Sequence, residues 1–188
     1  MKKVLILALL SLTAGSLAAQ QVQVNADKEL NHDFSQYKTF AWASQVDSKL
    51  DEGVYFLNDL VLKDRVRNAV QHELEGRGYK FSRQSPDLII NFRVFDKPTT
   101  IQGYSSYGVS YFGAMEMRDP EDARTFELEP GSLIVNIIDT KTSRMVWRGF
   151  VSGLMKDNAF NRDDAKIKQA VNLIFNEYGQ RADGLTSR

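Results

Sequence analysis

The chain has 188 residues, with 24 Lys plus Arg and 24 Asp plus Glu, and an apolar share of 43%. This length favours one domain, and this composition is typical of a globular protein. The balanced charge argues against a nucleic-acid-binding protein, which normally carries a basic surplus. There is no cysteine, and His32 and His72 are the only histidines. The sequence therefore excludes disulfides, thiol catalysis, cysteine-ligated metals and histidine-rich metal sites.

Residues 1–19 have the pattern of a secretory signal peptide. Lys2 and Lys3 form a positive segment, and residues 4–12 form an apolar run too short to span a bilayer. Small residues follow, which predicts cleavage near Ala18 or Ala19. The short run disfavours the alternative, an N-terminal membrane anchor. We expect an exported protein with no transmembrane segment in the mature chain, and no lipid anchor because there is no cysteine.

The remaining residues, 20–188, are predicted to form a single α+β domain. The expected elements are a strand that starts at 22–24, a turn at 33–35, a strand at 37–42, a helix at 60–77, strands at 88–95, 133–138 and 145–152, and a helix at 163–178.

Both predicted helices have one apolar face. The first aligns Leu62, Val66, Ala69, Val70 and Leu74, and the second aligns Ile167, Ala170, Val171, Ile174, Phe175 and Tyr178. The expected caps are Asn58 or Asp59 and Gly78 for the first helix, and Asn161 with Asp164 and Gly179 for the second.

The strand patterns predict how the sheet is covered. Apolar residues occupy one side of 88–95, while Ile89 and Phe95 lie on the other, so both faces are expected to be partly covered. Residues 133–138 are almost entirely apolar, and a short polar connection joins them to 145–152 as an antiparallel hairpin. We predict a largely antiparallel sheet of about three to five strands with two amphipathic helices on one face.

Residues 96–130 form a long loop or hairpin that is rich in Gly, Tyr and Ser and then charged. Its aromatic residues are the best binding candidates, because tyrosine combines a large ring with a polar group and loops often carry function. The candidate binding residues are Tyr104, Tyr107, Tyr111 and Phe112. The simpler interpretation is a flap or hairpin whose aromatics cover the sheet.

The aromatic residues outside this segment have a structural interpretation, whereas Arg148 has two alternative roles. Aromatic residues on the predicted strands are expected in the core, namely Phe34, Tyr37, Phe40, Trp42 and Trp147. Arg148 is either a surface cation or the partner of an acid such as Asp139 or Asp87.

No motif indicates an enzyme. There is no nucleophile elbow, and only His32 or His72 could act as the base for Ser105, Ser106 or Ser110. The acidic residues Asp119, Glu121 and Asp122 lack the spacing of a calcium loop. We assign no catalytic residue, no metal and no cofactor, although the sequence does not decide whether the chain is an enzyme.

Several short motifs together resemble a bacterial envelope family known as domain of unknown function 4136. They are Asp33-Phe34-Ser35-Gln36-Tyr37-Lys38-Thr39-Phe40-Ala41-Trp42, Arg77-Gly78-Tyr79, Ser85-Pro86-Asp87-Leu88, Gly131-Ser132-Leu133-Ile134-Val135, Ile138-Asp139, Lys141-Thr142 and Val146-Trp147-Arg148-Gly149. The resemblance implies an exported α+β domain of a Gram-negative bacterium with no established activity. Many members look like lipoproteins, whereas this chain has no anchoring cysteine.

These observations favour a periplasmic protein of unknown biochemical role. The preferred hypothesis is a non-enzymatic binding or scaffolding module whose partner is an envelope protein or a glycan, and not a nucleic acid. The alternatives are a small periplasmic hydrolase that uses carboxylates or His32, and a carrier of a small ligand held between the sheet and a helix.

Overall fold

The computed structural model describes residues 22–29, 32–43, 59–102, 108–109, 115–116, 125–156 and 159–184. The predicted signal peptide lies outside these ranges. So do the candidate binding residues Tyr104, Tyr107, Tyr111 and Phe112, the serines 105, 106 and 110, and the acidic residues Asp119, Glu121 and Asp122.

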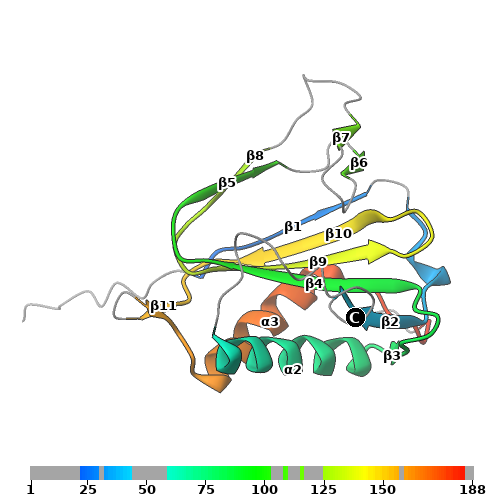
Figure 1. Ribbon diagram of the computed structural model, residues 1–188, viewed down its shortest axis with the longest axis horizontal. Coiled ribbons are helices and arrows are strands. Elements are labelled where there is room, and N and C mark those ends of the chain that lie inside the picture. Colours follow the sequence, from blue (N-terminus) through cyan, green and yellow to red (C-terminus); the bar gives the residue numbers. More distant parts are fainter. Residues whose placement is uncertain are drawn as a thin grey trace, which may run out of the picture.

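A six-stranded sheet forms the centre of the fold (Figure 1). Its strands are β1 (Val24–Lys28), β2 (Thr39–Trp42), β3 (Lys80–Phe81), β4 (Leu88–Phe95), β9 (Ser132–Asp139) and β10 (Arg144–Val151). Their order across the sheet is β1-β10-β9-β4-β2-β3. The central strands β9 and β4 are the most apolar segments, as expected for strands covered on both faces.

The sheet is mixed, which corrects the prediction of a largely antiparallel sheet of three to five strands. β1, β10, β9 and β4 pair antiparallel, whereas β2 runs parallel to both β4 and β3. The helix α2 (Leu60–Gly76) lies in the connection after β2, and such a crossover lets the chain return in the same direction. β3 has only two residues, too few to show an apolar alternation.

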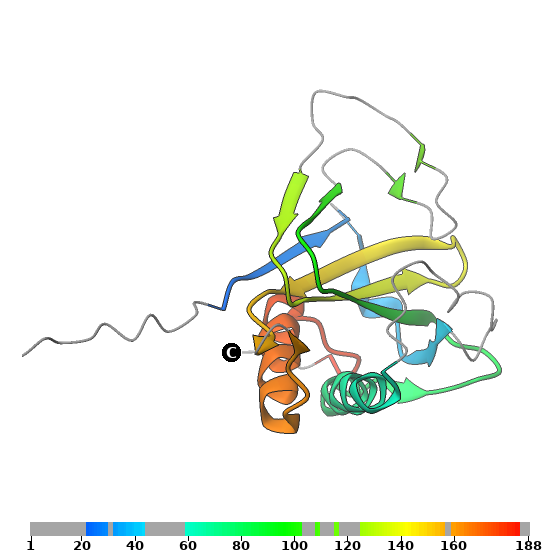
Figure 2. The same ribbon diagram turned by 60° about the vertical axis from the view of Figure 1, so that its left-hand side comes forward.

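Both helices pack on one face of the sheet, as predicted (Figure 2). α3 (Asp164–Tyr178) contacts β1, β10 and α2. The helix-side core contains all five aromatic residues assigned to it from the sequence, Phe34, Tyr37, Phe40, Trp42 and Trp147. Each large apolar side chain that becomes fully buried contributes roughly 1.5–3 kcal/mol to folding.

The helix ends agree with the sequence except at one cap. Asp59 Oδ1 accepts a hydrogen bond from Leu62 N at 3.1 Å at the start of α2, and Gly78 has the expected positive φ of 85° after its end. Gly179 closes α3 with φ 62°. The N-cap of α3 is Asp163, and not Asn161 with Asp164, because Asp163 Oδ1 accepts from Lys166 N at 2.9 Å.

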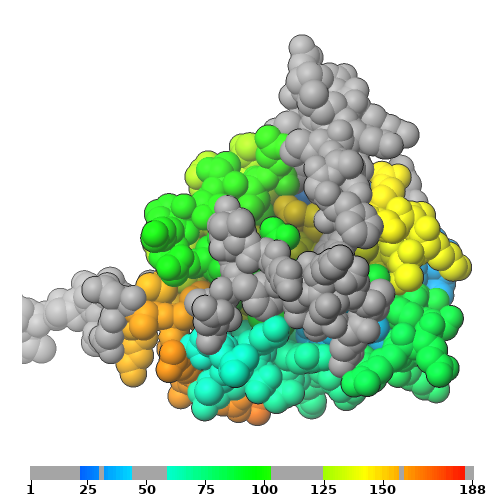
Figure 3. All heavy atoms as spheres, in the orientation of Figure 1, coloured from blue at the N-terminus to red at the C-terminus, as the bar shows by residue number. Residues whose placement is uncertain are grey.

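The remaining elements are short. The expected turn near residue 34 is the 3₁₀ helix η1 (Phe34–Gln36), and two small ladders join β6 (Gly108–Val109) to β7 (Met115–Glu116) and β11 (Met155–Lys156) to β12 (Ala159–Phe160). The ladder of β5 (Thr99–Gln102) and β8 (Thr125–Leu128) continues from β4 and β9 and rises above the face without helices (Figures 1 and 3). The segment predicted as a loop or hairpin is therefore a hairpin at its base.

Candidate functional site

Four polar side chains lie in register across the sheet face opposite the helices, which we call the open face. Asp27 of β1 is opposite Arg148 of β10, Arg148 is opposite Asn136 of β9, and Asn136 is opposite Asn91 of β4. We name these four residues the polar row. Asp27, Asn91 and Asn136 are only 7%, 7% and 9% exposed. Burial of polar groups is costly unless they are hydrogen-bonded, so several buried polar side chains in one row need an explanation.

A β-bulge in β10 places Arg148 in the row. The register with β9 shifts between Met145 and Trp147, and Val146 and Trp147 both lie in the helix-side core. Under strict alternation from Met145, Trp147 would face away from the helices and Arg148 would point into the core. The extra residue therefore buries the tryptophan and turns the arginine to the open face.

Arg148 connects the polar row to the β5–β8 ladder. Its Nε donates to Asn136 Oδ1 at 3.0 Å, and its Nη1 donates to the carbonyl oxygen of Gln102 at 2.9 Å. Arg148 is half-buried, so it is not the fully exposed surface cation considered from the sequence. Its guanidinium binds an amide oxygen and a carbonyl oxygen, and the acid opposite it in register is Asp27.

Apolar clusters flank the polar row along the strands. One consists of Phe95, Leu128, Ile134 and Phe150, and the other of Ala43, Ile89, Ile138 and Met145. Phe126 of β8 packs edge-on against Phe150, with 5.1 Å between the ring centroids, which holds the ladder against the sheet. The open face thus has a polar centre between two apolar ends.

The segment that carries the predicted binding aromatics enters and leaves beside this face. Gln102, the last residue of β5, is paired with Thr125, the first of β8, and its carbonyl is the one that Arg148 binds. The backbone of β6 lies against β10. Tyr104, Tyr107, Tyr111 and Phe112 themselves are outside the described residues.

A second polar cluster lies where β9 turns into β10. Tyr37 Oη donates to Asp139 Oδ2 at 2.6 Å, so its oxygen is the acceptor for His32 Nε2, also at 2.6 Å. His32 Nδ1 lies 3.1 Å from Glu29 Oε2, and Arg144 Nη2 lies 3.0 Å from Glu29 Oε1. Each of the two histidine nitrogens therefore has a partner.

Hydrogen bonding fixes the charges of the Tyr37–Asp139 pair. Burial raises the pKa of Tyr37, and its hydrogen bond to Asp139 raises that pKa further. Burial by itself would raise the pKa of Asp139, but the hydrogen bonds from Tyr37 and from the Thr142 and Lys141 amides outweigh it and lower the pKa. The proton stays on Tyr37 and the negative charge on Asp139, which suits a structural pair better than a nucleophile.

The motif residue Asp87 is structural as well. Its Oδ2 accepts hydrogen bonds at 2.9 Å from Lys38 N, Thr39 N and Thr39 Oγ1, so the residue just before β4 holds the start of β2. Two motifs that are distant in sequence, one containing Asp87 and the other Lys38-Thr39, are therefore joined by hydrogen bonds.

Two kinds of feature were sought in the part of the chain that the structure describes: clusters of metal-binding side chains and membrane-spanning helices. Residues 22–29, 32–43, 59–102, 125–156 and 159–184 hold no group of three or more His, Asp or Glu that could bind a metal ion. Within the same ranges, no helix combines the length and apolar character needed to cross a membrane.

Sequence reasoning missed the polar row, although a signal was present. Asn91 and Asn136 each interrupt a run of apolar residues, in 88–92 and 133–138. A single asparagine at such a position indicates a hydrogen-bonded site, but only the strand register shows that Asn91 and Asn136 are neighbours.

Three solved structures are similar to this chain, and the first of them supports the fold. A DUF4136 family protein from Bacteroides thetaiotaomicron matches with a TM-score of 0.55 and 17% identity, over 84% of this chain and 95% of that one. A PDZ domain protein from Parabacteroides distasonis matches with a TM-score of 0.49 and 18% identity; the match covers 84% of this chain and only 36% of that protein. A PelC dodecamer from Paraburkholderia phytofirmans matches with a TM-score of 0.44 and 8% identity, over 86% of this chain and 99% of that one.

A comparison with curated proteins finds no match. The family model for the domain of unknown function DUF4136 matches residues 22–178, which include both helices and the whole six-stranded sheet. The chain belongs to the DUF4136 family.

Proposed function

We propose that the chain is a non-enzymatic binding or scaffolding module of the bacterial envelope. The observation that supports this most directly is the polar row. Its Arg148 holds the end of β5, where the Gly/Tyr segment begins. A recognition loop gains affinity when a rigid scaffold fixes its ends, because less entropy is lost on binding. The proposed binding residues remain Tyr104, Tyr107, Tyr111 and Phe112.

The partner fits an envelope protein or a glycan better than a charged polymer. Tyrosine and arginine are enriched at interfaces, and aromatic rings supply contact area at low entropic cost. The two apolar clusters of the open face are buried, so they stabilise the scaffold and leave the contact surface to the aromatic segment. The equal numbers of acidic and basic residues give no reason to expect binding to nucleic acid.

The geometry of His32 makes a hydrolase the weaker alternative. A general base needs a ring nitrogen available for the proton of a nucleophile. The two nitrogens of His32 bind Tyr37 and Glu29. His72 lies on the exposed side of α2.

Capture in living cells tests the binding proposal. A photo-cross-linker replaces Tyr107, with Lys168 on the exposed side of α3 as the control position. We expect a discrete product from Tyr107 alone, identified by mass spectrometry. Arg148→Gln should reduce its yield because the end of β5 is released, whereas Arg93→Gln, which removes an exposed arginine from the same face, should not. Equal products from Tyr107 and Lys168, or equal yields from the two arginine variants, would contradict the proposal.

Export to the periplasm is a separate proposal, supported by the pattern of residues 1–19. When the full chain is expressed in a Gram-negative host, its intact mass in the periplasmic fraction should correspond to cleavage after Ala18 or Ala19. Lys2→Glu with Lys3→Glu should slow processing. Uncleaved chain in the cytoplasm would refute export.

A further inference from the structure

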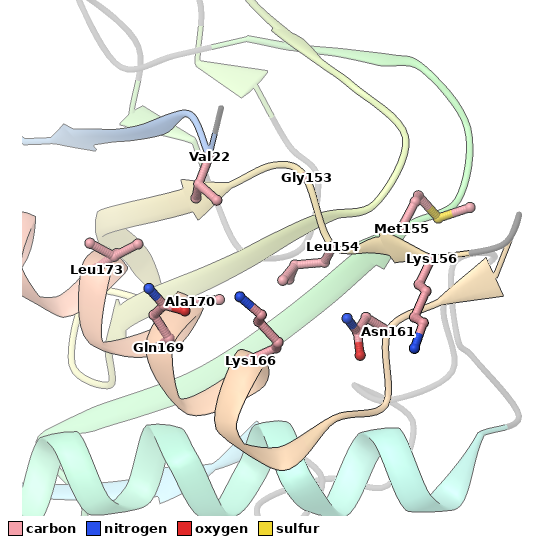
Figure 4. A pocket seen from close by; sticks show the side chains of 10 residues that line it. All are labelled: Val22, Gly153, Leu154, Met155, Lys156, Asn161, Lys166, Gln169, Ala170 and Leu173. Carbon is pink, nitrogen blue, oxygen red and sulfur yellow. The ribbon is translucent and has the colours of Figure 1, made fainter. Parts of the chain in front are cut away.

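A cavity of about 350 Å³ lies between the end of β10, the β11–β12 hairpin and the first turns of α3 (Figure 4). It shares no residue with the polar row. The lining has an apolar part, Val22, Gly153, Leu154, Met155, Ala170 and Leu173, and a polar part, Lys156, Asn161, Lys166 and Gln169. Its volume lies at the lower end of the range of small-molecule sites, about 300–1,000 Å³.

Backbone hydrogen bonds hold the wall of this cavity in place. Leu154 N donates to Gly131 O at 3.0 Å, and Asn161 N donates to Leu154 O at 2.7 Å. Met155 packs so closely on Gly131 that an added Cβ there would lie 2.6 Å from Met155 Cγ. Leu154 and Ala170 are only 5% and 3% exposed. The apolar part is therefore formed by the folded chain before any ligand arrives.

The polar part of the lining is cationic. Among the residues that the structure describes, no carboxylate lies within ion-pair distance of Lys156 or Lys166. The two acids at the start of α3 are engaged elsewhere, since Asp163 caps the helix and Asp164 pairs with Lys168 at 2.7 Å. Figure 4 shows the Lys166 ammonium group between the side chains of Leu154 and Gln169.

Asn161 adds a hydrogen-bond donor to this lining. Its Oδ1 accepts from Asp163 N at 2.8 Å, so its Nδ2 group is oriented by that bond and is left to face a ligand. The cavity thus combines an apolar floor with two ammonium groups and an amide donor.

We infer that this cavity binds a single-chain amphiphile with a negatively charged head group, of the chemical class of a medium-chain carboxylate. The apolar floor would accept the hydrocarbon chain, and Lys156, Lys166 and Asn161 would bind the carboxylate. A small inorganic anion would leave the floor unfilled, and a neutral lipid would leave the ammonium groups without a partner. The inference is independent of the proposed role of the open face.

Calorimetric titration of the purified full chain with decanoate, below its micellar concentration, tests this. Acetate is the control that has the charge but no hydrocarbon chain. Decanoyl glycerol is the control that has the chain but no charge. We expect saturable binding of decanoate and none of acetate or decanoyl glycerol. Octanoate should bind roughly tenfold more weakly than decanoate because two CH₂ groups are lost. Lys156→Gln with Lys166→Gln should weaken decanoate binding roughly tenfold. Lys168→Gln, the same change on the same helix, should leave it unchanged.

Amide chemical shifts provide a second readout that needs no variant. Decanoate should perturb residues 153–156 and 166–173 of the wild-type chain, and not the strands of the open face. Equal affinity for decanoyl glycerol, equal affinity of the double lysine variant, or shifts located elsewhere would each overturn the inference.

Discussion

Gly149 shows how one family motif is fixed by packing. It follows Trp147 and Arg148 on β10, and an added Cβ would lie 2.7 Å from both Trp147 Cζ2 and Ile174 Cγ2. The indole ring and α3 therefore occupy the space of a side chain. We predict that Gly149→Ala destabilises the fold by about 1–3 kcal/mol, because the core is forced to move. Urea unfolding followed by tryptophan fluorescence measures the change.

Gly76→Ala is the matched control for this prediction. Gly76 ends α2 with no neighbouring atom within 4 Å of an added Cβ. The same substitution there should be neutral or stabilising by up to roughly 1 kcal/mol, since alanine favours the helix. A Gly149→Ala variant as stable as Gly76→Ala would show that the contact with Trp147 relaxes freely.

Residue roles were predictable from sequence where they depend on burial alone. Large aromatic residues on strands are usually buried, so Phe40 and Trp147 were correctly predicted in the core, although the bulge that turns Trp147 toward the helices was not predicted. The role of Arg148 depends on a bulge and on its two cross-strand neighbours, Asp27 and Asn136. The polar row also needs the pairing of Asn91 with Asn136, which lie far apart in sequence, and a local pattern does not encode it.

At the scale of elements, the start of α3 discriminates between two candidate caps. Asp163 accepts from Lys166 N, while Asn161 accepts only from the backbone of Asp163. We predict that Asp163→Ala costs about 1 kcal/mol of stability, the usual loss for an N-cap, and that Asn161→Ala costs less. Thermal unfolding of both variants measures this. A larger loss of stability from Asn161→Ala would show that Asn161 is the more important cap, as the sequence predicted.

The elements themselves were largely predictable, whereas their pairing was not. The apolar faces of α2 and α3 repeat within each segment, and Gly78 and Gly179 mark their ends, so local chemistry suffices. The parallel pairing of β2 with β4 depends on how the chain crosses over after β2. β3 joins the sheet because Thr39 pairs with Lys80. A strand of two residues has no sequence pattern from which that pairing could be predicted.

For the whole molecule, two carboxylates join segments that are distant in sequence. Asp87 holds the start of β2 through three hydrogen bonds, and Asp139 joins the β9–β10 turn to Tyr37. Burial opposes the ionised form of both, but the hydrogen bonds that each accepts outweigh burial and lower the pKa of each below 3.8. Their contribution to stability is therefore linked to pH.

The sign of this linkage gives a prediction for acid unfolding. Because the folded pKa of both groups is depressed, their stabilising contribution is complete above the unfolded value of 3.8 and is lost as the pH falls through the lower folded values. Asp87→Asn with Asp139→Asn should lower the free energy of unfolding at pH 7 and flatten its decline below about pH 4. Urea unfolding from pH 7 to pH 2 measures both effects.

Asp164→Asn removes a surface carboxylate that pairs with Lys168 and should keep the wild-type slope. An unchanged acid slope in the double variant would mean that other groups drive acid unfolding.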